Sequence, residues 1–126
     1  MTEVAFTRIL SGSTDGRGIA VAATSTPGTL LHTAIVGVDH LDCVTLYATN
    51  TDTVNRTLTV EFGGVTDPDD QIKTTIAPSI GLVLIVPGFL LRNGLVVRAF
   101  ADSGSKIVVF GSYSRIPVNP NLAKTS

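Results

Sequence analysis

The side chains that could do chemistry are few and scattered along the chain. There are two histidines, His32 and His40, and one cysteine, Cys43. His40 and Cys43 stand three residues apart, as two zinc ligands can, but zinc takes three or four ligands and no second pair with suitable spacing is present. We therefore interpret Cys43 as a small core residue and expect no metal site.

A nucleophile–histidine–carboxylate site is not indicated either. Asp39 precedes His40, but residues 12–16 (GSTDG) have Thr14 where the G-x-S-x-G motif requires serine. The glycine-rich residues 12–18 also lack the Lys-Ser/Thr pair of a phosphate-binding loop. We expect His32 and His40 to be satisfied by ordinary polar neighbours, and we predict no catalytic residue and no cofactor.

Three carboxylates, Asp67, Asp69 and Asp70, form the densest acidic group. Their oxygens suit Ca²⁺, but the segment lacks the twelve-residue EF-hand pattern, and Pro68 is equally typical of a turn. We interpret the segment as a solvated turn. The glycosylation pattern at Asn55 is taken as a chance match, because no signal peptide is recognisable at the start of the chain.

Short runs of alternating apolar and polar residues fill most of the chain and predict β-strands. In residues 57–62 (TLTVEF), Leu58, Val60 and Phe62 would face the core, while Thr57, Thr59 and Glu61 would face outward. Asn93-Gly94 is the strongest hairpin signal. The predicted strands cover residues 30–37, 41–49, 55–62, 71–77, 80–86, 95–101 and 106–116. Strands at this spacing, without a helical pattern, predict an all-β fold, a β-sandwich that could be jelly-roll-like.

The predicted organisation has three parts. Residues 1–28 are interpreted as an N-terminal arm, residues 29–116 as the β-sandwich domain, and residues 117–126 as an extended C-terminal tail. Residues 80–86 (IGLVLIV) are apolar on both faces of their strand. That strand is therefore either covered by the chain's own arm or loops, or buried against a neighbouring subunit.

Composition excludes several function classes. Charged residues make up only 15% of the 126 residues, the net charge is −1 and no run of Lys or Arg occurs, so nucleic-acid binding is not expected. The longest apolar run, residues 80–87, is far too short to span a membrane. A small domain with so few charges either has an ordinary core and a surface rich in Thr, Ser and Asn or hides surface against a partner, and we favour the second. Without a recognisable signal peptide or membrane span, we expect the protein to be made and kept in a cytoplasm until it is used.

Three segments, residues 46–64, 81–101 and 109–116, resemble small structural proteins of tailed bacteriophages. The resemblance carries no catalytic motif and transfers no site residue. It implies a virion location after synthesis in the host cytoplasm, binding to a major capsid protein or another virion protein, and a homo-oligomer, with a trimer favoured.

The function expected from this resemblance is that of a capsid decoration (cement) protein, which binds and stabilises the capsid lattice, and not that of an enzyme. A head–tail connector or tail-tube component is the alternative within the virion. A sugar- or ligand-binding β-sandwich is the alternative from another class, although the chain has no Trp for a sugar-stacking platform.

Overall fold

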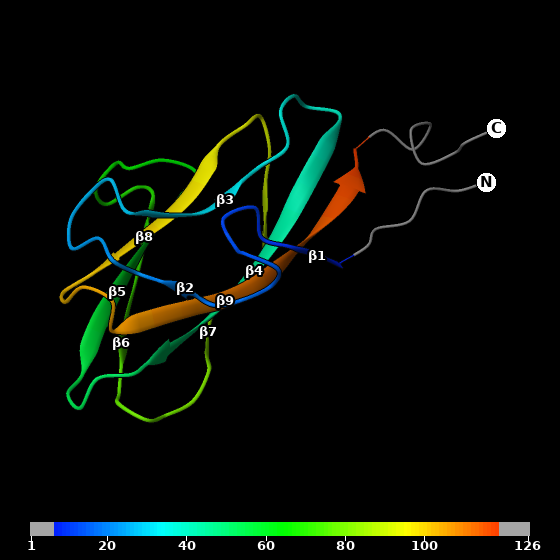
Figure 1. Cartoon of the computed structure of the whole chain (residues 1–126). Helices are drawn as coiled ribbons and strands as arrows, with labels where there is room; N and C mark the ends of the chain where they lie inside the picture. The colour runs from blue at the N-terminus through cyan, green and yellow to red at the C-terminus, as the bar shows by residue number, and fades with distance from the viewer. Residues whose placement is uncertain (1–6, 119–126) are drawn as a thin grey trace.

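A computed structural model describes residues 7–118 of the chain, and the statements below concern that part. It is an all-β structure of two antiparallel sheets, as the sequence predicted (Figure 1). The strands are β1 (Thr7–Ile9), β2 (Ile19–Ala20), β3 (Thr29–Thr33), β4 (His40–Asn50), β5 (Arg56–Phe62), β6 (Gln71–Ile76), β7 (Val83–Leu91), β8 (Val96–Ala101) and β9 (Ile107–Pro117).

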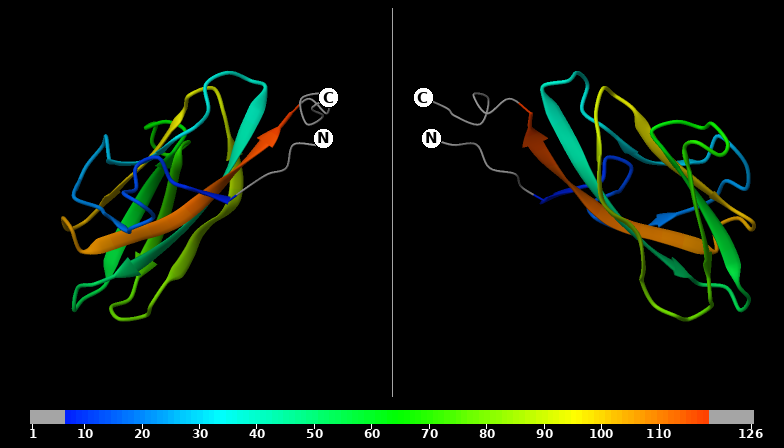
Figure 2. Two further views of the ribbon diagram at one scale, coloured as in Figure 1. Left: turned by 45° about the vertical axis from the view of Figure 1, so that its right-hand side comes forward. Right: turned by 180° about the vertical axis from the view of Figure 1, so that it is seen from behind.

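The strand order divides the chain between two layers. Sheet 1 has the order β1–β9–β4–β7, with β2 also pairing with β9, and sheet 2 has the order β3–β8–β5–β6. The long strands β4 and β9 run side by side in antiparallel register from His40↔Pro117 to Asn50↔Ile107 (Figures 1 and 2). Only β5 and β6 are consecutive strands that pair with each other, so every other connection from β2 onward passes between the sheets.

Alternating side chains from the two sheets form one core. Val44, Leu46 and Ala48 of β4 meet residues such as Leu58 and Val60 of β5, and all five are fully buried. These are the positions that period-two alternation assigns to the inward face, because successive residues of a strand point to opposite sides. The predicted inward face of residues 57–62 is therefore confirmed.

The predicted N-terminal arm is wrong for the described part of residues 1–28. Strands β1 and β2 both pair with β9, and Leu10 and Val21 are only 1% and 0% exposed. The Gly12 N–H also donates to the Leu31 carbonyl at 2.9 Å, which satisfies the edge of β3. Residues 7–28 therefore belong to the sandwich. The tail predicted from residue 117 falls mostly outside the described residues, although Pro117 itself ends β9.

Two turn predictions need correction at β7. The strand predicted over residues 80–86 instead begins at Val83 and continues through Pro87 and Gly88 to Leu91, with register shifts against β4 before Thr45 and after Leu46. Proline is tolerated there because β7 is an edge strand. Asn93 and Gly94 do take positive φ values, 68° and 71°, as predicted for a tight turn. However, they connect strands of different sheets and form no hairpin.

The sequence predicted that the outer face of β5 is open to solvent, but in the structure this face is largely covered. Thr59 and Glu61 point away from the core, yet they are only 3% and 0% exposed. Glu61 accepts hydrogen bonds from the Gly28 N–H at 2.7 Å and the Thr26 hydroxyl at 2.5 Å. The connection between β2 and β3 is thereby held by Glu61 on the outer side of sheet 2.

A buried polar cluster and the candidate interaction surfaces

A polar cluster lies at the inward side of β3, β4 and β9. His32 and Asp42 are fully buried, and His32 Nε2 lies 2.9 Å from Asp42 Oδ2. Arg115 donates to both carboxylate oxygens of Asp42, from Nε at 2.8 Å and from Nη2 at 3.2 Å. The Ile35 N–H donates to Asp42 Oδ2 as well, and Tyr113 packs on the His32 ring with centroids 4.2 Å apart.

The hydrogen bonds fix which nitrogen of His32 carries a proton. The Ser11 backbone N–H, which can only donate, lies 3.1 Å from Nδ1, so Nδ1 accepts and Nε2 donates to Asp42. Both ring nitrogens are thus used within a site that solvent does not reach. A general base needs a free nitrogen beside a substrate, and this cluster offers none. We interpret it as a link that ties the two sheets together.

Burial sets the direction of both pKa shifts. Burial lowers the pKa of His32 below its usual 6.5, although the hydrogen bond and charge of Asp42 oppose this. Burial alone would raise the pKa of Asp42, but hydrogen bonds from Arg115 and His32 outweigh it, so that pKa lies below 3.8. The same bond to Asp42 raises the pKa of Arg115. The native cluster therefore holds an ionised Asp42 between a neutral His32 and a charged Arg115.

We expect stability to fall as pH drops below about 6.5. There the unfolded chain binds a proton at His32 that the native state refuses, and linkage then lowers the unfolding free energy by at most about 1.4 kcal/mol per pH unit. A second loss should begin below about 3.8, where unfolded Asp42 is protonated before native Asp42. Urea midpoints measured between pH 8 and pH 5 test the first loss. The pH dependence of the urea midpoint should be weaker in His32→Gln. An unchanged pH dependence would show that another group causes the loss of stability.

The residues weighed as metal ligands are not brought together. His40 and Cys43 are an odd number of residues apart on β4, so they lie at positions that alternate to opposite faces. Asp70 accepts a hydrogen bond from the Thr66 N–H at 3.0 Å and so closes its own loop. In residues 7–118 no group of three or more His, Cys, Asp or Glu side chains could hold a metal ion.

The outer face of sheet 1 is a broad surface without charged side chains. At its centre, Tyr47 of β4 lies opposite Leu84 of β7 on one side and Phe110 of β9 on the other, and all three are exposed. The positions that register assigns to this face are Thr7, Ile9, Ala20, Leu41, Cys43, Thr45, Tyr47, Thr49, Leu84, Pro87, Leu90, Val108, Phe110, Ser112, Ser114 and Ile116. This set is called face 1 below. The apolar strand that includes residues 83–86 thus has one buried face and one exposed face.

A second apolar surface lies at one end of the sandwich, where the β3–β4 and β7–β8 loops meet (Figure 1). The Asn93 and Gly94 N–H groups donate to the Gly37 and Ile35 carbonyls at 3.0 and 2.9 Å, which holds the two loops together. Exposed apolar side chains gather on them, namely Val36, Val38 and Leu95. Val36 is 84% exposed, so it makes almost no contact within its own chain. These three residues are called the loop end.

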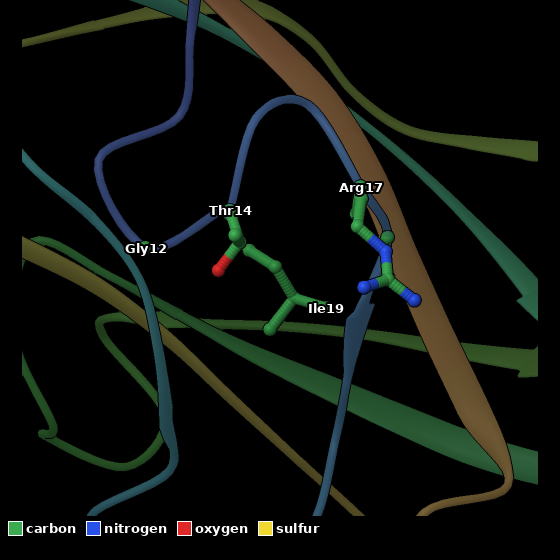
Figure 3. A pocket seen from close by; sticks show the side chains of 5 residues that line it. Gly12, Thr14, Arg17 and Ile19 are labelled. Atoms are coloured by element: carbon green, nitrogen blue, oxygen red, sulfur yellow. The ribbon is translucent and has the colours of Figure 1, made fainter.

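Two shallow hollows complete the described surface. One, of about 230 Å³, is lined by Gly12, Thr14, Arg17, Gly18 and Ile19 beside β9 (Figure 3). The other, of about 260 Å³, lies on the outer side of sheet 2 and is lined by Thr24, Thr57, Thr59, Lys73, Phe100, Ala101 and Asp102. Both are small and open, and neither contains a nucleophile beside a base.

Sequence reasoning missed Asp42, Arg115 and Tyr113 as partners of His32. One signal was available, because Asp42 shares the inward parity of Val44, Leu46 and Ala48 on β4. A carboxylate at such a position must be paired, since an isolated buried charge is very costly. The identity of the partners depends on the β4–β9 register, which no local pattern reveals.

Comparison of the chain with known protein families, with curated proteins and with solved structures found no match. The described residues include no helix that is long and apolar enough to cross a membrane.

Proposed function

We propose that this protein is a structural assembly subunit of a virion, of the capsid decoration type that its sequence resembles. It would act by burying apolar surface against neighbouring proteins, with many copies together stabilising a lattice of major capsid protein. The observation that carries this proposal is face 1, a wide sheet surface with exposed Leu84, Tyr47 and Phe110 and no charged side chain. Exposed apolar patches of this kind mark interaction sites.

The strand order supports the same proposal. Apart from the consecutive pair β5 and β6, strands β2 to β9 alternate between two four-stranded rows, β2–β9–β4–β7 and β3–β8–β5–β6. This division is the one expected if the sandwich is jelly-roll-like, an architecture used by viral capsid and lectin domains. Fold alone does not establish function, so the proposal depends on the surfaces and takes the fold as support.

The loop end supplies a second apolar surface, apart from face 1. A protein that joins neighbours needs at least two contact surfaces. We assign the loop end to contact with the capsid, because Val36 and Val38 are exposed where hydrogen bonds hold two loops together. Burying one valine side chain contributes about 1.5–3 kcal/mol, which corresponds to about tenfold or more in affinity.

Particle binding tests the proposal directly. Virus particles purified from the source of this gene should carry the chain in many copies, and added recombinant protein should co-sediment with particles that lack it. Val36→Asp should weaken this binding about tenfold or more, whereas Val54→Asp at the exposed β4–β5 turn should not. If the chain is absent from particles and does not bind them, the proposal fails.

A ligand-binding module is the second candidate, and the hollow on sheet 2 is the observation that favours it. Three threonine hydroxyls, the Lys73 ammonium and the Asp102 carboxylate surround this hollow beside Phe100. Such groups could orient a small polar ligand such as a sugar. A glycan array would test this, and binding that is abolished by Lys73→Ala would favour it over the assembly role.

A further inference from the structure

The outer face of sheet 1 lacks charged residues, as a face buried in an interface would. A sheet with one face in solvent normally carries its polar and charged residues on that face. Here the charged residues Arg8, Asp42 and Arg115 lie at inward positions, and face 1 carries none. We propose that face 1 is buried against face 1 of a second copy of this chain, in a two-fold dimer of stacked sheets. This inference rests on the proposed function in taking face 1 as an interface, and it names the occupant.

The central row of face 1 is self-complementary. Tyr47 lies between Leu84 and Phe110 in the β7–β4–β9 register. A two-fold axis that runs along β4 and passes over Tyr47 places Leu84 of one copy over Phe110 of the other, and Tyr47 over Tyr47. Every large side chain in the row then meets an apolar or aromatic one, and aromatic pairs add to the energy of burial.

The support beneath this row is rigid. A Cβ atom at Gly18 would come within 2.6 Å of the Phe110 ring and of Val108, so the backbone at Gly18 closes on both side chains. Arg17, next to Gly18 in the chain, lines the hollow beside β9 (Figure 3). Under the two-fold axis it approaches the β7 side of the second copy and not its own equivalent. The two Arg17 side chains therefore do not meet.

The size of face 1 comes close to what a dimer needs. Nine residues of β4, from Leu41 to Thr49, span about 30 Å, and four strand positions span about 19 Å. Two such faces bury about 1,100 Å² before the relief of the side chains is counted. Specific interfaces bury about 1,200 Å² or more in total, so face 1 comes close to that class only if all of it is covered. A flat two-fold stack covers it all, whereas a three-fold arrangement covers only the part nearest the axis.

Sedimentation equilibrium of the full chain tests the dimer. The wild-type protein should be a dimer at micromolar concentration, and Tyr47→Lys and Leu84→Lys should each weaken it about a hundredfold or more, because a lysine would be desolvated in an apolar contact. Val54→Lys is the matched control, since Val54 is 51% exposed and Leu84 is 50% exposed. All three variants should keep the wild-type circular dichroism spectrum and urea midpoint at concentrations where the wild type is a monomer.

Crosslinking tests the geometry independently of affinity. In a Cys43→Ser background, Tyr47→Cys should join two copies through a bis-maleimide that spans about 10 Å, the spacing of stacked sheets. Thr53→Cys, on the exposed β4–β5 turn, should not. A monomer at all concentrations, a trimer, or a dimer that Tyr47→Lys leaves intact would overturn the inference. A dimer that does not bind particles would support this inference and refute the proposed function. A monomer that binds particles would support the proposed function and refute this inference.

Discussion

Replacing Asp42 with alanine should remove much of the protein's stability. Asp42 is fully buried and accepts hydrogen bonds from His32 Nε2, the Ile35 N–H and both Nε and Nη2 of Arg115. The variant would leave these donors without their acceptor, including those on the fully buried His32 and the partly buried Arg115. Breaking a buried ion pair by removing one partner costs about 3–5 kcal/mol, out of a total of about 5–15 kcal/mol for a typical domain. The urea midpoint followed by circular dichroism measures the loss.

The matched control for this experiment is Asp102→Ala. The Asp102 side chain is 47% exposed and its nearest recorded ion-pair partner, an Arg56 nitrogen, is 3.9 Å away, so its removal should barely move the midpoint. Asp42→Asn adds a second comparison, because it keeps the shape of the side chain and removes the charge that Arg115 faces. If Asp42→Ala were as mild as Asp102→Ala, the cluster would not tie the sheets together.

The seven strands from β3 to β9 could be predicted because their pattern is local. Alternation along residues 57–62 or 41–49 follows from the two-residue period of a strand, and Gly, Asn, Asp and Pro mark where the runs end. The structure places β5 at Arg56–Phe62 and β4 at His40–Asn50, within one residue of the predicted bounds. Edge strands are different, since β1 and β2 have only three and two residues, too few for any period to show.

What the sequence could not reveal depends on contacts between distant residues. Glu61 reads as a surface residue because it alternates with Val60 and Phe62, yet the hydrogen bonds from Thr26 and Gly28, more than thirty residues away, bury it. His32 on β3 likewise meets Asp42 on β4 only because the two sheets pack together, and the pairing of β4 with β9 brings Arg115 to Asp42. In the described residues every buried side-chain nitrogen and oxygen has a hydrogen-bond partner. The polar groups that local reasoning misplaced are therefore satisfied by the tertiary fold.

The apolar residues 80–86 differ in their burial. Residues 80–86 left open whether the chain itself or a neighbour covers the second face. The structure buries Ile85 and Val86 in the core and leaves Ile80, Leu82 and Leu84 more than half or about half exposed. No described segment covers Leu84. Leu84 therefore belongs to the exposed, uncharged face 1 on which the proposed interface depends.

Substituting aspartate at Val60 should prevent folding, and the same substitution at Thr59 should not. Val60 is fully buried between the sheets, where an unpaired carboxylate costs several kcal/mol, comparable with the whole stability of a domain. Thr59 is also buried, at 3% exposure, but it points to the outer side of sheet 2 and lies opposite Lys73 in the β5–β6 register. A carboxylate there can pair with the ammonium group of Lys73 across the strands.

Three variants separate these effects. Val60→Asp should show an unfolded circular dichroism spectrum, and Thr59→Asp should fold with a lower urea midpoint than the wild type. Adding Lys73→Ala to Thr59→Asp should lower the midpoint by more than Lys73→Ala lowers it in the wild type, because the buried carboxylate then loses its partner. If the outer face of sheet 2 were fully exposed, Thr59→Asp would keep the wild-type urea midpoint. That result would contradict the covering of this face by residues 26–28, which are hydrogen-bonded to Glu61. Equal unfolding by Val60→Asp and Thr59→Asp would show that Lys73 cannot reach a carboxylate at position 59.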